Sequence, residues 1–204
     1  MSREEKTGLV CKEARAKELK SWKDRGVFEC TEKGNPSMTM RWVDVWKDGA
    51  NGERKAKSRL VCRGFLDRDL KHLRKDAPTA MPLSQRLVVQ GSLQGGWKLK
   101  SLDISTAFLH ADIDREVLVK PPREAEEPPG VLWRLKKAVY GLADSPRLWW
   151  KHLSSIVKQS GAKQSCLDPT LFYIKGEGML VIHVDDIMWT GTNEFEEKVI
   201  GAIK

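Results

Sequence analysis

The chain contains 204 residues, of which 40% are hydrophobic, and it carries a formal net charge of +8 at neutral pH. A chain of this length and apolar content can form one domain with a buried core, and the excess of basic residues favours a polyanionic partner. The four cysteines form no Cys-X-X-Cys pair, which argues against a zinc finger or a disulfide scaffold. The N-terminus has no apolar signal segment and the apolar runs are too short to span a bilayer, so we expect an intracellular, cytoplasmic protein that contacts no membrane.

The first third of the chain predicts a helix followed by a β-hairpin. Residues 12–25 are rich in helix-forming residues. Residues 40–47 and 56–63 have the composition of strands, and the pairs Asp48-Gly49 and Asn51-Gly52 between them are typical of a tight turn. We therefore expect the two strands to pair.

The second strand of this hairpin carries an alternating basic pattern. Because successive side chains of a strand point to opposite faces, Lys57, Arg59, Val61 and Arg63 share one face. The opposite face is small or apolar and is expected to be buried; it consists of Ala56, Ser58, Leu60 and Cys62. A cationic row of this kind suits phosphate groups, since Arg can bind two of their oxygens at once and Lys supplies a point charge. The alternative is the solvated polar face of an ordinary amphipathic hairpin.

Three further helices are expected: one that ends at Gly95-Gly96, one over residues 146–160, and one at the C-terminal end of the chain. Small polar residues that can accept a hydrogen bond from a free backbone N–H stand at their starts, namely Ser84, Asp144 or Ser145, and Asn193. The last two helices carry apolar stripes, formed by Trp149, Leu153, Ile156 and Val157 and by Phe195, Val199 and Ile203.

Short strand-like segments alternate with these helices. They are a segment ending at Asp103 and residues 116–120, 131–135, 171–174, 179–184 and 187–190, with a proline-rich loop over 121–130. Most of these strands are joined by turns, so their order favours an α+β fold with an antiparallel sheet over a doubly wound fold.

Two adjacent aspartates, Asp185 and Asp186, interrupt the apolar run from Met179 to Gly191, where we expect them to form the turn of a hairpin. Asp103 stands at the end of a similar segment. Carboxylates at the ends of separate strands can converge on the two divalent ions of a phosphoryl- or nucleotidyl-transfer site. Such hard oxygen ligands favour Mg²⁺ over Zn²⁺. The alternative is a solvated turn.

A third segment precedes the helix expected at 146–160. Gly141 allows a ligand to approach the backbone closely, and Ser145-Pro146 is typical of a helix start. Tyr140 and Phe108 lie near the expected site, where aromatic rings can pack on a nucleotide sugar or base. The alternatives are a simple strand-to-helix connection and two aromatic residues of the core.

Seven motifs follow one another along the chain: Arg41-Trp42-Val43, Lys57-Ser58-Arg59-Leu60-Val61-Cys62-Arg63-Gly64-Phe65, Asp76-Ala77-Pro78-Thr79, Leu102-Asp103-Ile104-Ser105-Thr106-Ala107-Phe108-Leu109, Leu135-Lys136-Lys137-Ala138-Val139-Tyr140-Gly141-Leu142, Ser145-Pro146-Arg147-Leu148-Trp149 and Val184-Asp185-Asp186-Ile187. In this order and spacing they resemble the reverse transcriptase of copia-type LTR retrotransposons, an RNA-directed DNA polymerase that is part of a Pol polyprotein. The resemblance covers residues from about Ala14 to Ile200.

The resemblance implies a fingers-and-palm polymerase core that adds dNTPs to a primer 3′-hydroxyl on an RNA or DNA template. It also implies two Mg²⁺ ions, for which Mn²⁺ can substitute. By position, Asp103, Asp185 and Asp186 correspond to the catalytic, metal-binding aspartates of the palm, with Asp185 the stronger ligand of the adjacent pair. The backbone carbonyl of Ile104 is expected to complete the metal shell.

The resemblance also implies which residues bind the nucleotide. Lys57 and Arg59 correspond to the finger residues that grip the incoming triphosphate. Phe108 occupies the position that rejects a ribose 2′-hydroxyl, and Tyr140 and Gly141 are expected to lie against the nucleotide.

Three residues depart from the family pattern: His183 replaces an aromatic residue, typically tyrosine, and Ala143-Asp144 replaces Lys-Gln. We expect an N-terminal tail over 1–13 and a fingers-and-palm core over 14–204, with the thumb, the RNase H and the other Pol segments outside this chain. Two alternatives are a catalytically inactive remnant that only binds nucleic acid, and another Mg²⁺-dependent phosphotransferase or nuclease.

Overall fold

The computed structural model describes residues 8–48 and 52–203. The chain divides into two compact units, each built from two separate stretches of sequence. Unit 1 comprises Met1–Lys75 and Phe108–Ser145, and unit 2 comprises Asp76–Ala107 and Pro146–Lys204. Each unit has its own antiparallel sheet structure.

Unit 1 contains the helix α1 (Leu9–Asp24) and two antiparallel sheets. One sheet is the hairpin of β2 (Met40–Asp48) and β3 (Arg54–Cys62). The other has the order β1-β6-β5 and consists of β1 (Phe28–Thr31), β5 (Leu118–Val119) and β6 (Leu132–Leu135). Short 3₁₀ turns cover Gly64–Leu66, Arg123–Ala125 and Ala107–His110, the last of which begins with a residue of unit 2.

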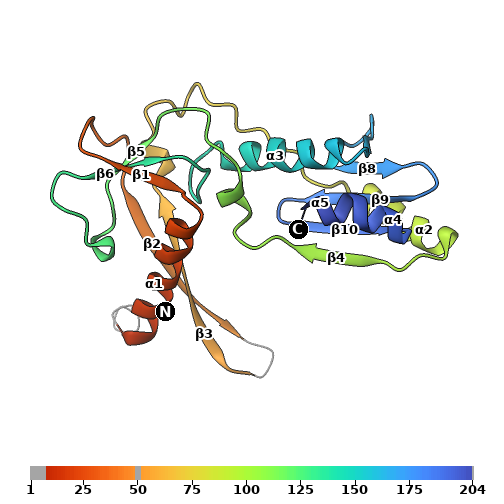
Figure 1. Cartoon of the computed structure of the whole chain (residues 1–204), viewed down its shortest axis with the longest axis horizontal. Helices are drawn as coiled ribbons and strands as arrows, with labels where there is room; N and C mark the ends of the chain where they lie inside the picture. Colours follow the sequence, from red (N-terminus) through yellow and green to blue (C-terminus); the bar gives the residue numbers. More distant parts are fainter. Residues whose placement is uncertain (1–7, 49–51, 204) are drawn as a thin grey trace. The chain divides into compact units, whose positions relative to one another are not determined.

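The helix α1 packs against β3, beside the long β2–β3 hairpin (Figure 1). Burial alternates along β3 as the sequence predicts: Lys57 is exposed and Arg59 is half-buried, whereas the buried positions are Ser58, Leu60 and Cys62. Leu60 and Cys62 join a core with Leu19 and Trp22 of α1 and with Trp133 of β6. Burial of this apolar face holds the hairpin in one register, because a slip by one residue would turn the charged face inward.

Unit 2 is built on a five-stranded antiparallel sheet with the order β4-β10-β9-β8-β7. Its strands are β4 (Lys100–Asp103), β7 (Lys163–Gln164), β8 (Leu171–Ile174), β9 (Gly178–His183) and β10 (Asp186–Gly191). Its helices are α2 (Pro82–Gly95), α3 (Ser145–Gln159, whose first residue belongs to unit 1), α4 (Asn193–Phe195) and α5 (Gly201–Ile203), with a π-helical turn over Glu196–Ile200.

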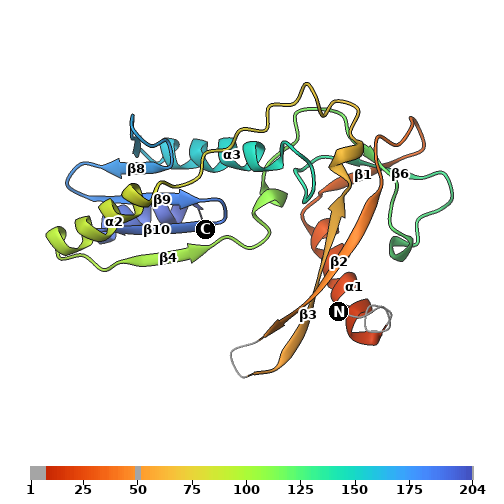
Figure 2. The same cartoon turned by 180° about the vertical axis from the view of Figure 1, so that it is seen from behind.

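Helices cover the sheet of unit 2 through buried apolar side chains. α2 packs against β9 and β10 (Figure 2). From α3, Leu153 and Val157 are fully buried, and from α4 the ring of Phe195 is fully buried. A Cβ atom at Gly178 would lie 2.7 Å from that ring, so the glycine allows α4 to sit on the end of the β9–β10 ladder.

The antiparallel pairing of every sheet confirms the expected α+β class. Within residues 8–48 and 52–203, no helix is both long enough and apolar enough to cross a membrane.

The helix caps differ from those expected. α2 begins at Pro82, because proline is preorganised for the first helical position, and Ser84 therefore lies inside the first turn. At α4 the cap is Thr192 rather than Asn193, since the Thr192 hydroxyl accepts a hydrogen bond from the N–H of Phe195. α1 begins at Leu9, earlier than expected and inside the segment expected to be a tail.

One strand prediction also needs correction, because only Leu118 and Val119 of the expected strand 116–120 are paired in the sheet. The two strands of the β2–β3 hairpin pair as predicted. The expected turn residues Gly49 and Asn51 lie outside the described residues.

A buried carboxylate ties α2 to the segment before β8. Asp168 is 3% exposed and accepts hydrogen bonds from the backbone N–H of Met81, from the hydroxyl of Ser84, and from the backbone N–H and hydroxyl of Thr170, the last two at 2.8 and 2.7 Å. Burial opposes ionisation, but the donors from Ser84, Thr170 and Met81 outweigh it and lower the pKa of Asp168 below its ordinary value.

We predict that Asp168→Ala lowers the free energy of unfolding by about 2–4 kcal/mol at pH 7, because it leaves several buried donors without an acceptor. Since the folded pKa is depressed, this stabilisation is present above the ordinary carboxyl pKa and is lost as the pH falls through the folded pKa. Urea unfolding at pH 7 and at acidic pH measures both effects. Glu197→Ala, at an exposed position, is the control. An equal loss of unfolding free energy in the two variants would contradict the stabilising role assigned to Asp168.

Candidate active site

Two of the three aspartates face each other across the sheet of unit 2. In the antiparallel pairing of β4 with β10, Asp103 and Asp186 are direct partners. Residues that are directly opposite on neighbouring strands project to the same face of the sheet, with Cβ atoms about 5 Å apart. The register therefore places two carboxylates of like charge side by side.

The hairpin turn lies one residue earlier than the sequence predicts. The turn residues are Val184 and Asp185, and Asp186 is already the first residue of β10, paired with His183. Val184 has a φ of 59°. A positive φ at the first turn residue is the geometry that matches the twist of a two-residue hairpin, although a β-branched residue adopts it only under strain. Strand propensity alone assigns Val184 to the strand, which explains the error.

Two hydrogen bonds hold this turn. The indole Nε1 of Trp149 donates to the carbonyl of Val184 at 2.7 Å, and the N–H of Ile104 donates to the carbonyl of Asp185 at 2.9 Å. The apolar stripe of the helix predicts that Trp149 is a core residue, and the burial of its side chain agrees with that prediction. Its polar contact with the hairpin has no local sequence signal.

The aspartates can accept a cation. Asp103 and Asp186 are exposed and Asp185 is half-buried, and among the described residues none of the three side chains has a protein hydrogen-bond or ion-pair partner. Also within that part of the chain, no three His, Cys, Asp or Glu side chains form a group that could by itself hold a metal ion. The paired carboxylates of Asp103 and Asp186 thus offer hard oxygen donors and uncompensated negative charge, which suit Mg²⁺ together with ligands from water or substrate.

The expected nucleotide-binding residues belong to unit 1, and three of them lie together. The guanidinium of Arg59 lies over the ring of Tyr140 at 5.1 Å from its centroid, within the range of a cation–π interaction. The ring of Phe108 meets that of Tyr140 edge-to-face, with centroids 5.2 Å apart. Lys57 is exposed on the same strand face as Arg59. The aspartates lie in unit 2.

Gly141 lies where two backbone segments touch. It has a φ of 90°, and a Cβ atom there would lie 2.1 Å from the carbonyl oxygen of Cys62. The N–H of Cys62 in turn donates to the carbonyl of Tyr140 at 2.8 Å. This close approach explains the glycine by backbone packing, and it connects the end of β3 to the segment that carries Tyr140.

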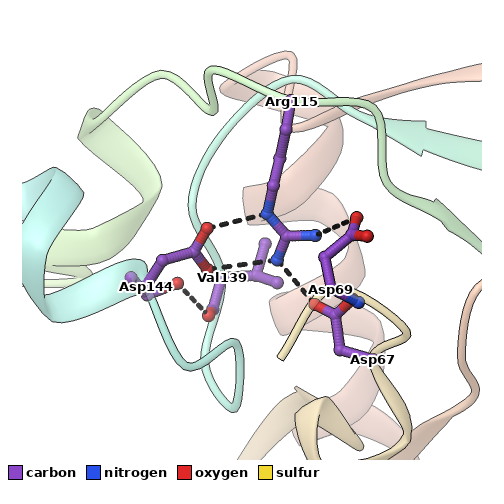
Figure 3. A network of polar contacts seen from close by, with 6 residues as sticks. Asp67, Asp69, Arg115, Val139 and Asp144 are labelled. Atoms are coloured by element: carbon purple, nitrogen blue, oxygen red, sulfur yellow. Dashed lines mark hydrogen bonds and ion pairs between the residues drawn. The ribbon is translucent and has the colours of Figure 1, made fainter. Parts of the chain in front are cut away.

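A half-buried arginine that the sequence did not single out, Arg115, joins the same two segments. The guanidinium of Arg115 donates to Asp144 from Nε at 2.8 Å and to Asp67 from Nη2 at 2.7 Å, while Asp69 lies 3.9 Å away (Figure 3). The side chains of Asp67 and Asp144 are 2% and 6% exposed, so removal of Arg115 would leave two buried carboxylates without their cation. The Ser145 hydroxyl donates to the carbonyl of Val139. Asp144 and Ser145, the two expected caps of α3, thus both have partners outside the helix.

We predict that Arg115→Met lowers the free energy of unfolding of unit 1 by about 3–5 kcal/mol, because two buried carboxylates lose their cation. Chemical denaturation measures the loss. Arg134→Met is the control, since Arg134 pairs with the more exposed Glu29 and Glu116 and such pairs contribute about 1 kcal/mol or less. Adding Asp67→Asn and Asp144→Asn to Arg115→Met is expected to recover part of the stability. If Arg115→Met lowered the free energy of unfolding no more than Arg134→Met does, the network of Arg115 with Asp67 and Asp144 would not stabilise the fold as proposed.

The chain is similar to known proteins over most of its length. Residues 28–202 match the family described as reverse transcriptase (RNA-dependent DNA polymerase). The chain is 31% identical over 168 residues to the retrovirus-related Pol polyprotein from transposon RE2 of Arabidopsis thaliana, a match that covers 78% of this chain and 12% of that protein. It is 27% identical over 206 residues to the Pol polyprotein from transposon TNT 1-94 of Nicotiana tabacum, covering 95% of this chain and 15% of the relative.

A solved structure supports the fold. The foamy viral protease-reverse transcriptase dRH in complex with double-stranded DNA aligns with a TM-score of 0.50 at 15% identity, covering 95% of this chain and 28% of that one. The chain thus spans only a small part of the polyproteins it matches. It belongs to the reverse transcriptase family, as the reverse transcriptase domain of a copia-type retrotransposon Pol polyprotein.

Proposed function

We propose that this chain contributes the fingers and palm of an RNA-directed DNA polymerase, with unit 1 as the fingers and unit 2 as the palm. The observation that carries the proposal is the direct pairing of Asp103 with Asp186 at the Val184-Asp185 hairpin. These carboxylates have no protein partner among the described residues, which favours a role toward a ligand. The proposed compartment is the cytoplasm.

Asp103, Asp185 and Asp186 are the proposed ligands of two Mg²⁺ ions, with Mn²⁺ as a substitute. The backbone carbonyl of Ile104 is a further proposed ligand. The N–H of the same residue donates a hydrogen bond to the backbone carbonyl of Asp185. When bound, such a metal pair activates the primer 3′-hydroxyl and stabilises the charge on the departing pyrophosphate. The carboxylates of Asp103, Asp185 and Asp186 would hold these ions on unit 2.

Lys57, Arg59, Phe108, Tyr140 and Gly141 form the proposed dNTP site. The side chains of Lys57 and Arg59 bind the triphosphate and offset the charge that develops on it. Stacking on Tyr140 supports the position of the Arg59 guanidinium. Phe108, packed edge-to-face on Tyr140, is the proposed barrier to a ribose 2′-hydroxyl, and the backbone at Gly141 lies against the nucleotide.

The partner proposed for the exposed basic surface is a template–primer of RNA or DNA. After β3 the segment 63–75 exposes Arg63, Arg68, Lys71 and Lys75. The segment also contains two acidic residues: Asp67 is buried against Arg115, and the exposed Asp69 lies 3.9 Å from Arg115. The exposed charge of the segment is therefore mainly positive, which suits a phosphate backbone.

We predict that the chain incorporates dNTPs on a primed RNA template with Mg²⁺, and that Asp103→Asn and Asp186→Asn each reduce incorporation by about 100-fold or more, since both remove charge from the metal site. Asp112→Asn is the control, because Asp112 is an exposed acid that pairs with Lys137. Undiminished incorporation in either active-site variant would refute the metal assignment. Binding of template–primer without incorporation by the wild type would instead favour the inactive, nucleic-acid-binding remnant.

The basic segment gives a second prediction, on salt dependence. The triple variant Arg68→Gln, Lys71→Gln, Lys75→Gln is expected to reduce the magnitude of the slope of log K against log salt for template–primer binding by about 2–3. Each basic side chain that contacts a phosphate releases counterions on binding, and the variant loses three such side chains. The matched control changes three exposed lysines of α1 in the same unit, Lys12, Lys17 and Lys20, to glutamine. Fluorescence anisotropy at several salt concentrations measures both slopes. Equal slopes in the two triple variants would show that only net charge matters.

A further inference from the structure

Trp149 reaches from α3 to the aspartate hairpin. Its side chain is 4% exposed, and its Nε1 donates to the backbone carbonyl of Val184 at 2.7 Å. The ring also packs near His152, with ring centroids 5.9 Å apart. An indole combines a large apolar body with one directed donor, so this residue can fill the space beneath the hairpin and still satisfy a backbone carbonyl.

The carbonyl that Trp149 binds belongs to the strained residue of the turn. Val184 has a φ of 59°, a left-handed backbone conformation that is unusual for a β-branched residue. Strained backbone of this kind persists only where the surroundings hold it. Two hydrogen bonds restrain this backbone: the indole N–H of Trp149 donates to the carbonyl of Val184, and the N–H of Ile104 donates to the carbonyl of Asp185.

The same turn determines where two of the three aspartates lie. Asp185 is its second residue, and Asp186 follows at once, opposite Asp103. A rotation of the peptide between Val184 and Asp185 would move the Asp185 carboxylate and disturb the first pair of the β4–β10 ladder. The orientation of that peptide is what the Trp149 hydrogen bond restrains.

We propose that Trp149 is a positioning residue, whose indole N–H fixes the Val184-Asp185 turn and thereby sets the Asp185 and Asp186 carboxylates for divalent metal binding with Asp103. The metal part of this inference rests on the proposed function. The inference that Trp149 restrains the turn does not depend on the proposed function, because it rests on the hydrogen bond from Trp149 to Val184.

The first test measures the affinity of the full chain for Mn²⁺ by paramagnetic broadening in NMR. Trp149→Phe keeps an aromatic ring and removes the donor, and it is expected to weaken Mn²⁺ binding by about 10-fold or more, as loss of a residue that orients metal ligands does. Trp150→Phe, the next residue of α3, packs near Phe172 instead and is expected to leave the affinity unchanged. Wild-type affinity in Trp149→Phe would overturn the proposal.

The second test needs no metal and no activity. Hydrogen exchange of the Ile104 amide, which donates to the carbonyl of Asp185, is expected to accelerate in Trp149→Phe and not in Trp150→Phe. The amide of Val88, a fully buried residue of α2 in the same unit, serves as the internal reference and is expected to keep its rate. Equal acceleration at Val88 and Ile104 would mean that Trp149 is only a core residue, and the proposal would be wrong. Absence of Mn²⁺ binding in the wild type with selective exchange at Ile104 would refute the metal site and leave the positioning of the turn supported.

Discussion

The register between β4 and β10 is the constraint on which the proposed chemistry depends. Because side chains alternate along a strand, a slip by one residue would send Asp103 and Asp186 to opposite faces of the sheet. The Val184-Asp185 turn sets where β10 begins, and the bonds from Trp149 and Ile104 hold that turn. The packing of α2 on β9 and β10 secures the same strands. The turn, its two hydrogen bonds and the packing of α2 thus all stabilise the register that places Asp103 opposite Asp186.

The buried acids Asp44, Asp67, Asp144 and Asp168 have cations or hydrogen-bond donors from the protein itself. Arg115 binds Asp67 and Asp144, and Arg15 together with Ser58 binds Asp44. Asp168 has donors from Met81, Ser84 and Thr170. By contrast, Asp103 and Asp186 are exposed and unpaired in the part of the chain that the structure describes. A pair of facing carboxylates without protein donors is the arrangement that a bound divalent cation would stabilise.

Local periodicity predicted the elements on which the site is built. The alternation along β3, the end of β4 at Asp103 and the helix over 146–160 follow from side-chain patterns, and the structure has each of them. Periodicity failed where geometry overrides propensity: Val184 reads as a strand residue but adopts a turn conformation, and Pro82 begins α2 ahead of Ser84. The Arg115 network was invisible to sequence reasoning, because Asp67 and Asp144 lie 48 and 29 residues from Arg115.

We propose that Asp103 and Asp186 jointly bind divalent metal. A crystal structure of the chain with template–primer, a non-hydrolysable dNTP analogue and Mn²⁺, with the ions located by their anomalous scattering, tests this most directly. We expect an ion at about 2 Å from carboxylate oxygens of both Asp103 and Asp186. Ordered nucleotide with Mn²⁺ bound elsewhere, or with neither aspartate as a ligand, would contradict it.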